Sequence, residues 1–313
     1  PCFKTVIAFT ALLPMGMYQA TGITYDSIVM AVSLVIIALF FKARSAGLHR
    51  REIITLFALS LILGCCKGGV YLLFLLLFFT IPFSKFGSKK VKYKICMGSL
   101  GTGIIGLVLT SRNNYLSLFR TFLAGIGKSL STPAVGTNAA SQMVPESEVI
   151  AYGMGYAFES PISFIKLLCT TLVQEADRYV GSLVGNHMAC RSDRLISWVV
   201  IIMFLLLLWM AVTPVESERM KVTIFERVFC AGILVTEIVG LHILMLIETP
   251  IGRSVISGVQ GRYFLAWVPI VMLILYDGNR TYNIQGKRRL FFYLSITEIA
   301  YLYLFLNNYL GVG

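Results

Sequence analysis

Long apolar stretches recur along the whole chain, and they limit its fold more than any other feature of the sequence. A helix that crosses the hydrocarbon core of a bilayer needs roughly 20 apolar residues, within a range of about 17–25. We therefore expect an all-α fold, a polytopic transmembrane helix bundle with about nine spans. The candidate segments are residues 3–20, 26–41, 52–65, 69–83, 94–111, 194–213, 225–247, 262–277 and 288–309.

The third and fourth segments are short, and residues 64–69 between them contain Gly pairs, which favour a turn. One long kinked helix is the alternative, although its apolar length would exceed what one span needs.

The composition agrees with a membrane protein. The 313 residues are 57% hydrophobic and 13% charged, whereas a soluble domain is about 25% charged. In water, such a chain would expose larger apolar patches than monomeric proteins carry. The composition therefore argues against a cytosolic enzyme, a nucleic-acid-binding protein and a disordered chain.

Lys and Arg are concentrated in short loops that alternation puts on one side of the membrane. If the loop 42–51 is cytoplasmic, the loops 84–94, 214–227 and 278–289 are cytoplasmic too, and with Lys4 they hold most of the 27 Lys and Arg residues. Cytoplasmic loops of membrane proteins are rich in these residues. The net charge of +12 thus follows from topology and predicts contact with anionic membrane lipids, not with nucleic acid.

Hydropathy divides the chain into three parts. They are an N-terminal group of five spans in 1–111, an extracytoplasmic loop with amphipathic helices in 112–193, and a C-terminal group of four spans in 194–313.

The middle part has two helical patterns. Residues 115–123 have amphipathic spacing, and Ser160-Pro161 is typical of a helix start. Apolar residues then recur at helical spacing from Ile165 to Leu183, which predicts a helix lying on the membrane or across the mouths of the spans. This part is either a cover without a chemical role or a lid over an outward-facing cleft.

Three ionisable residues lie well inside predicted spans, where the bilayer makes them costly. They are Glu237, His242 and Glu298, and we expect each to face the bundle interior. A polar tie between helices and a proton path are both open interpretations. The seven Cys and three His residues lack the spacing of a zinc site, and Cys169 could pair with Cys190.

A second polar set gathers at the outer ends of the spans. Two or three cations beside one or two carboxylates suit the binding of an anionic lipid headgroup next to a polar acceptor. The cations would bind the headgroup phosphate, Arg through two hydrogen bonds and Lys as a point charge. Anchoring at the membrane interface is the alternative role for such residues. The set consists of Asp26, Lys67, Glu248, Arg253, Gln260, Arg262 and Tyr263.

Several short motifs resemble one bacterial membrane-protein family, the domain of unknown function 2142. Its most specific feature is the block Gly258-Val259-Gln260-Gly261-Arg262-Tyr263-Phe264-Leu265, and Ala266 stands where the family usually has Pro. The other motifs are Leu12-Leu13-Pro14, Gln19-Ala20, Tyr25-Asp26, Lys67, Ser160-Pro161 and Leu167. The resemblance extends over the whole chain, from the middle of the family's usual sequence onward.

The resemblance implies a role in synthesis of bacterial cell-surface polysaccharide and cell wall, in a multi-pass protein of the cell membrane. The family is similar to the C-type glycosyltransferase fold, whose enzymes take sugar from a polyprenyl phosphate at the outer face and pass it to a glycan acceptor. Asp26 then matches a carboxylate at the outer start of a span, and Lys67 matches a Lys near the phosphate. The family's other acidic residue, a base or metal ligand, would precede Pro1. No cofactor is specified, although a divalent cation would suit this fold.

Three functions remain open from the sequence. In a lipid-linked glycosyltransferase, Asp26 would take the proton of the acceptor hydroxyl, and Lys67 and Arg262 would stabilise the phosphate leaving group. Gln260 could bind a sugar hydroxyl, with Glu248 a weaker candidate. A transporter, flippase or polymerase-like component of the same pathway would use the same cations without breaking a bond. A scaffold subunit would tie partner helices through its buried carboxylates.

Overall fold

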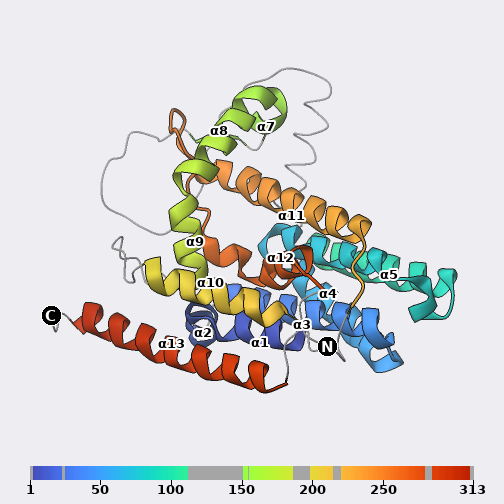
Figure 1. Cartoon of the computed structure of the whole chain (residues 1–313). Coiled ribbons are helices and arrows are strands. Elements are labelled where there is room, and N and C mark those ends of the chain that lie inside the picture. Colours follow the sequence, from blue (N-terminus) through green and yellow to red (C-terminus); the bar gives the residue numbers. More distant parts are fainter. Residues whose placement is uncertain are drawn as a thin grey trace. The chain divides into compact units, whose positions relative to one another are not determined.

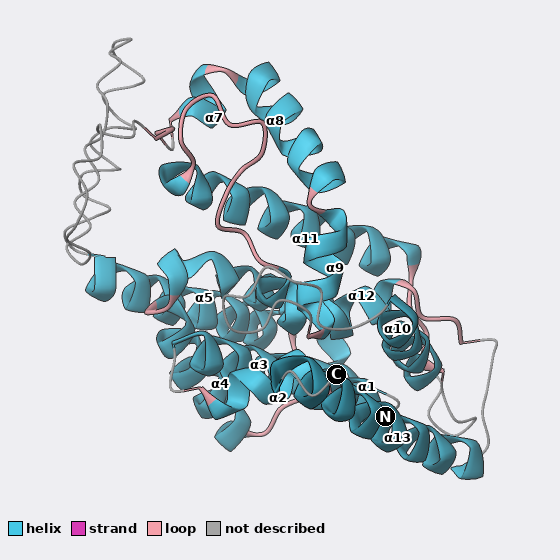
Figure 2. Cartoon of the chain, turned by 90° about the vertical axis from the view of Figure 1, so that its left-hand side faces the viewer, coloured by secondary structure: helices cyan, strands magenta, loops and turns pink. Residues whose placement is uncertain are grey.

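Helices joined by loops make up the described part of the chain. The computed structural model describes residues 3–22, 25–111, 151–153, 155–185, 198–213, 220–278 and 284–310. Within these ranges no strand forms beyond an isolated β-bridge between Ala151 and Pro250 (Figure 2). The all-α class is therefore confirmed. The helix predicted at 115–123 lies outside the described residues. So does Cys190, with which Cys169 could pair.

The predicted apolar segments coincide with helices (Figure 1). The helices of the N-terminal part are α1 (Phe3–Leu12), α2 (Pro14–Thr21), α3 (Tyr25–Ala46), α4 (Arg50–Gly64), η1 (Lys67–Thr80), η2 (Phe83–Phe86) and α5 (Lys89–Ser111). Those that follow are α7 (Tyr156–Glu159), α8 (Pro161–Gln174), α9 (Ala176–Val184), α10 (Trp198–Val212), α11 (Ile224–Met245), η4 (Leu246–Glu248), η5 (Gly261–Trp267), α12 (Val268–Ile274) and α13 (Ile284–Leu310).

Three helices in the described ranges, α3, α5 and α11, are long and apolar enough to cross a membrane. Other apolar helices are shorter, with 10–17 residues, whereas α13 has 27 residues but is not among these three. The segment predicted at 3–20 is two helices, because Pro14 lacks a backbone N–H and begins α2 at its first position. The segment at 262–277 begins as the 3₁₀ helix η5 before α12. The number of nine spans stays a prediction.

The described residues group into two compact units. The first contains Pro1–Thr110, Arg178–Val235 and Gln260–Gly313, and the second contains Ser111–Asp177 and Thr236–Val259. The hydropathy pattern divides the chain into 1–111, 112–193 and 194–313 by position in the sequence and not by spatial contact. This division stays a prediction.

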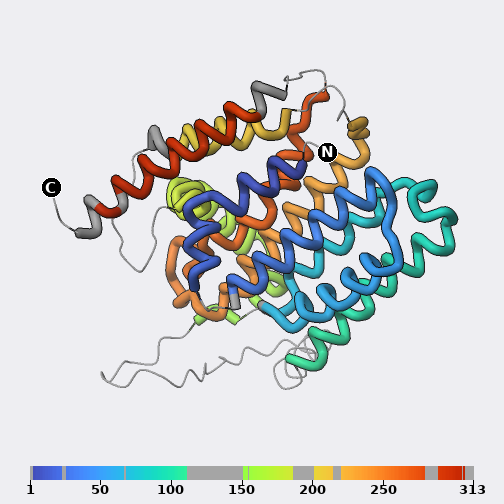
Figure 3. Tube along the Cα trace, turned by 90° about the horizontal axis from the view of Figure 1, so that it is seen from below, coloured from blue at the N-terminus to red at the C-terminus, as the bar shows by residue number. Residues whose placement is uncertain are grey.

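The first unit has a large apolar core. Phe3 of α1 stacks on Phe41 of α3 with ring centroids 4.0 Å apart. Phe74 of η1 stacks on Trp267 of η5, also at 4.0 Å. In Figure 3, α13 (red) runs beside α10 (yellow), and Tyr301 of α13 meets Phe204 of α10 edge to face. These contacts join segments far apart in the sequence into one bundle.

Glycines bring α4 and α5 into close contact within the first unit. A Cβ on Gly64 would lie 1.9 Å from the Gly103 carbonyl oxygen, and a Cβ on Gly106 would lie 2.2 Å from that of Leu61. Real side chains do not approach this closely, so the two backbones touch through glycine. Membrane helices commonly pack in this way, since lipid supplies little hydrophobic force for helix association.

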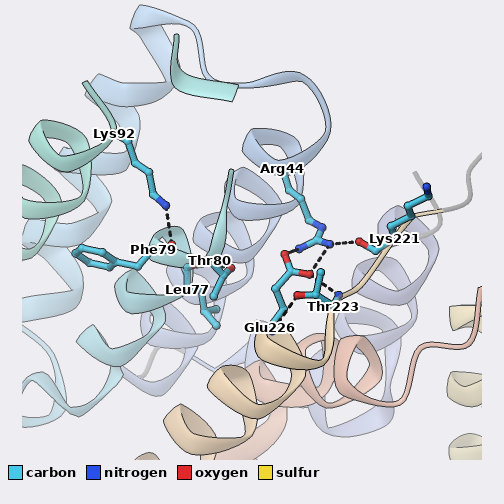
Figure 4. A network of polar contacts seen from close by, with 8 residues as sticks. All are labelled: Arg44, Leu77, Phe79, Thr80, Lys92, Lys221, Thr223 and Glu226. Atoms are coloured by element: carbon cyan, nitrogen blue, oxygen red, sulfur yellow. Dashed lines mark hydrogen bonds and ion pairs between the residues drawn. The ribbon is translucent and has the colours of Figure 1, made fainter. Parts of the chain in front are cut away.

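A polar network joins the last turn of α3 to the start of α11 in the first unit (Figure 4). Arg44, near the end of α3, forms a buried ion pair with Glu226 at the start of α11 and donates a 2.5 Å hydrogen bond to the Lys221 carbonyl oxygen. Arg227 donates to the carbonyl oxygens of Ile274 and Tyr276, each at 2.6 Å. The contacts of Arg44 join residues of the loops 42–51 and 214–227, which alternation along the sequence assigns to one side of the membrane.

The length of α3 fits the thickness of a bilayer. Asp26 lies in its first turn and Arg44 in its last. With a rise of 1.5 Å per residue, these two charged residues are about 27 Å apart along the helix. A hydrocarbon core is about 30 Å thick. Lys42 is the one charged residue between them, and the uncharged residues 27–41 are thus the part of α3 that suits lipid.

The second unit is built around α8. This helix begins at Pro161, directly after Ser160, as predicted from sequence. It ends before Glu175, so the predicted continuous helix to Leu183 is divided into α8 and α9. The Thr171 hydroxyl accepts a 2.8 Å hydrogen bond from the Ile256 backbone N–H and holds the loop that follows η4 against α8.

Candidate functional site: a polar pocket at the start of α3

A small pocket lies at the end of the first unit where α3 begins. The empty space at the pocket is about 240 Å³, with the open solvent at its mouth included. Its residues come from α2, α3, η1 and η5. They are Gln19, Asp26, Val29, Met30, Tyr71, Arg262, Tyr263 and Ala266.

Asp26 and Arg262 form an ion pair in this pocket, although 235 residues separate them in the chain. Arg262 Nε lies 3.5 Å from Asp26 Oδ2, and the side chains are 31% and 11% exposed, respectively. Charge-assisted hydrogen bonds between such groups are about 2.7–2.9 Å long. The pair is therefore looser than a fork of two short hydrogen bonds, and Arg262 retains donors for another anion.

Gly261 allows η5 to approach α9 and so fixes the position of Arg262. A Cβ at Gly261 would lie 1.9 Å from the Tyr179 carbonyl oxygen and 2.7 Å from the Leu183 backbone nitrogen. The Gly261 N–H donates a 2.8 Å hydrogen bond to the Ser182 hydroxyl. These contacts explain why glycine precedes the arginine.

Tyr71 holds η1 against η5 at the pocket. Its hydroxyl donates a 2.9 Å hydrogen bond to the Tyr263 carbonyl oxygen. The guanidinium carbon of Arg262 lies 5.6 Å from the Tyr263 ring centroid, within the range of a cation–π contact. Tyr263 thus positions the arginine through its ring, while its backbone is fixed by Tyr71.

Two other residues predicted for the site, Lys67 and Gln260, lie at the starts of η1 and η5. Lys67 begins η1, in the turn where Gly68 and Gly69 adopt positive φ of 61° and 72°, and its side chain lies outside the described part of the structure. Gln260 caps the start of η5 and is not among the residues that line the pocket. Its binding of a sugar hydroxyl stays a prediction.

Glu248 and Arg253 belong to the second unit. Both are exposed, and the Arg253 N–H donates a 3.2 Å hydrogen bond to the Pro250 carbonyl oxygen. A Cβ on Gly258, whose φ is +89°, would lie 2.9 Å from Glu248 Oε2. Gly258 therefore shapes the loop beside Glu248, and substrate binding by either charged residue stays a prediction.

The carboxylates and histidine predicted inside the spans do not line the pocket. Glu237 and His242 are buried in α11, and His242 Nδ1 lies 2.7 Å from the Ile238 carbonyl oxygen of the same helix. Both carboxylate oxygens of Glu298 are buried in α13. The proton path and the polar tie between helices stay predictions.

Five pocket residues were not assigned to the site from sequence, and two of them, Gln19 and Tyr71, have polar side-chain atoms. Gln19 did offer a clue, because an amide side chain inside an apolar segment is costly unless it has a partner. Tyr71 offered none, because an aromatic residue in a run of Leu and Phe is most simply a core residue.

The pocket residues do not fit a divalent cation. Asp26 supplies the carboxylate among them, and the positive charge of Arg262 beside it opposes a second cation. In the described ranges, no group of three or more His, Cys, Asp or Glu side chains is close enough to hold a metal ion. We therefore derive the chemistry of this pocket without a metal.

Comparison with known proteins gives one family. The family model described as "Predicted membrane protein (DUF2142)" matches residues 3–274. No curated protein matches the chain. No solved structure matches it either.

Proposed function

The chain belongs to the family of predicted membrane proteins called DUF2142, and from this premise we propose that it transfers a sugar from a polyprenyl phosphate to a glycan acceptor. The reaction would take place in the pocket of Asp26 and Arg262, at the extracytoplasmic face of a bacterial cell membrane. The observation that carries the proposal is the pairing of a carboxylate and a guanidinium at the start of a helix long enough to span a bilayer.

The proposed reaction is a substitution at the anomeric carbon of the donor sugar. An acceptor hydroxyl oxygen forms a bond to that carbon, and the bond from the carbon to the phosphate oxygen breaks. The hydroxyl proton passes to the Asp26 carboxylate, which acts as general base. The polyprenyl phosphate leaves with the bonding electron pair.

Arg262 would stabilise the leaving group. Negative charge grows on the phosphate oxygens as the bond breaks, and a fixed cation beside them lowers the barrier. Arg suits this role because its planar donors match two phosphate oxygens. Its loose contact with Asp26, at 3.5 Å, leaves it able to bind phosphate while holding the carboxylate in place.

The position of the pocket suits a lipid-linked donor. Asp26 is separated from the charged network around Arg44 by one apolar helix. A phosphate at the headgroup level of the membrane would thus meet Arg262 while its polyprenyl chain stays in the lipid. A soluble sugar nucleotide has no lipid chain that the membrane could hold in this way.

We expect the purified protein in detergent to release sugar from its lipid carrier. The assay uses polyprenyl phosphates carrying radiolabelled glucose, galactose, mannose or N-acetylglucosamine, with a cell-surface glycan extract as acceptor. Labelled glycan or free sugar, formed without any membrane compartment, supports transfer. Intact donors in this assay, together with movement of the same donors across proteoliposome membranes, would contradict transfer and favour a flippase.

A further inference from the structure

Gln19 is held rigidly at the end of α2. Its carbonyl oxygen lies 2.5 Å from the Ser27 hydroxyl and accepts a 3.2 Å hydrogen bond from the Gly22 N–H. Ser27 is next to Asp26 in the first turn of α3. The same contact therefore connects the backbone of Gln19 to the helix that carries the carboxylate.

The side chain of Gln19 is buried in the pocket wall. The residue is 6% exposed, and its Oε1 accepts no hydrogen bond from the described residues. A buried amide oxygen without a donor costs free energy, and nearly all such groups in folded proteins are paired. Leu or Met would fill the same volume without this cost. The amide thus points to a ligand that supplies a hydrogen-bond donor.

The neighbouring groups limit the chemistry of that ligand. Arg262 Nε is also buried, and its 3.5 Å contact with Asp26 Oδ2 is an ion pair without hydrogen-bond geometry. A guanidinium only donates hydrogen bonds, whereas the Gln19 amide both donates and accepts them. A bare phosphate would bind Arg262 but would offer no donor to Gln19 Oε1. A neutral sugar would bind Gln19 but would bring no anion to Arg262. A phosphate attached to a sugar with free hydroxyls satisfies both.

The pocket is open at its mouth, and its empty space of about 240 Å³ includes that opening. We therefore expect only the sugar next to the phosphate to reach Gln19, whereas a longer glycan would extend into solvent.

We propose that Gln19 determines which sugar the protein accepts, because its amide binds one hydroxyl of the monosaccharide attached to the phosphate. This inference rests on the proposed function, in which Arg262 binds the phosphate and Asp26 faces the acceptor. It adds a residue that recognises one hydroxyl of the donor sugar and does not contact the carrier.

The test measures binding to the full-length protein in nanodiscs with three kinds of probe. The first is the four polyprenyl-phosphate monosaccharides named above, the second is polyprenyl phosphate without sugar, and the third is the matching sugar 1-phosphates. For the sugar that binds best, singly deoxygenated analogues are added. Wild type is compared with Gln19→Leu and Gln19→Met, and with Thr21→Val as a matched control. Thr21 is exposed on the same helix, and its hydroxyl bonds the Tyr18 carbonyl oxygen.

Gln19→Leu and Gln19→Met should weaken binding of the preferred lipid-linked sugar about tenfold, the effect of losing one hydrogen bond. They should leave polyprenyl phosphate without sugar unchanged. One deoxy analogue should bind wild type and both variants equally, because it lacks the hydroxyl that Gln19 contacts. Thr21→Val should behave as wild type. Because the unglycosylated carrier reports on Arg262, its unchanged binding also shows that the Gln19 variants are folded.

Each of the other possible results overturns one specific part of the two proposals. Gln19 does not recognise the sugar if its variants bind the lipid-linked sugar as tightly as wild type does. The same conclusion follows if they lose as much affinity for the unglycosylated carrier as for the lipid-linked sugar. The proposed function survives both results. If sugar 1-phosphates bind as tightly as the lipid-linked forms, the substrate class is a free sugar phosphate. If no polyprenyl phosphate binds wild type, both proposals fail.

Discussion

Arg262→Ala should reduce sugar transfer on the order of 10²–10³-fold, the usual effect of removing a group that stabilises negative charge in a transition state. The alanine leaves Asp26, which is 11% exposed, without this cation and leaves the phosphate without a bidentate donor. Arg262→Lys should recover part of the activity, since it restores the charge but not the planar fork. The measurement is the rate of radiolabel transfer from the polyprenyl-phosphate sugar that the wild type uses.

The matched control for this variant is Arg50→Ala. Arg50 is exposed at the start of α4, in a loop assigned by sequence to the opposite side of the membrane, so its loss should leave transfer unchanged. Equal yield and equal elution in size-exclusion chromatography establish that the variants are folded. Transfer by a well-folded Arg262→Ala protein at the wild-type rate would remove Arg262 from the mechanism.

Gly261→Ala should destabilise the first unit by about 3 kcal/mol, at the upper end of the usual cost of overpacking. The added methyl group would lie 1.9 Å from the Tyr179 carbonyl oxygen, and a backbone atom cannot rotate away as a side chain can. Either η5 or α9 must move, and Arg262 would move with η5. Thermal unfolding followed by size-exclusion chromatography in detergent measures the loss.

Gly101→Ala is the control for Gly261→Ala. A Cβ on Gly101 of α5 meets nothing within 4 Å, and alanine favours a helix by about 1 kcal/mol over glycine. We expect this variant to be as stable as wild type or slightly more stable. Equal stability of the two alanine variants would mean that η5 does not contact α9 as described.

Hydropathy was sufficient to predict where most helices lie, because long apolar runs have few other ways to fold in a membrane. Local breaks were harder to place. Pro14 ends α1 by a known local rule, so this break could have been anticipated. The sequence carries no Gly or Pro at the end of α8 that would have marked it. The 3₁₀ helix η5 packs against a distant segment, as the contact of Gly261 with α9 shows.

The candidate site was predicted in part. Alternating topology suggested that Asp26 and Arg262 share one side of the membrane, and the structure pairs them at 3.5 Å. Topology predicts only the side of the membrane on which a residue lies, however. It does not predict which residues on that side share a pocket. Gln19 enters the pocket because Ser27 connects the end of α2 to α3, and a contact of this kind has no pattern in a single sequence.

A cryo-electron-microscopy structure of the protein in a nanodisc, with a polyprenyl-phosphate monosaccharide bound, tests the central proposal most directly. We expect the phosphate to lie about 3 Å from the Arg262 guanidinium, the length of a charge-assisted hydrogen bond, with the sugar beside Gln19 and the polyprenyl chain in the lipid. A donor phosphate bound away from Arg262, or an Arg262 side chain directed into the lipid tails, would contradict the account.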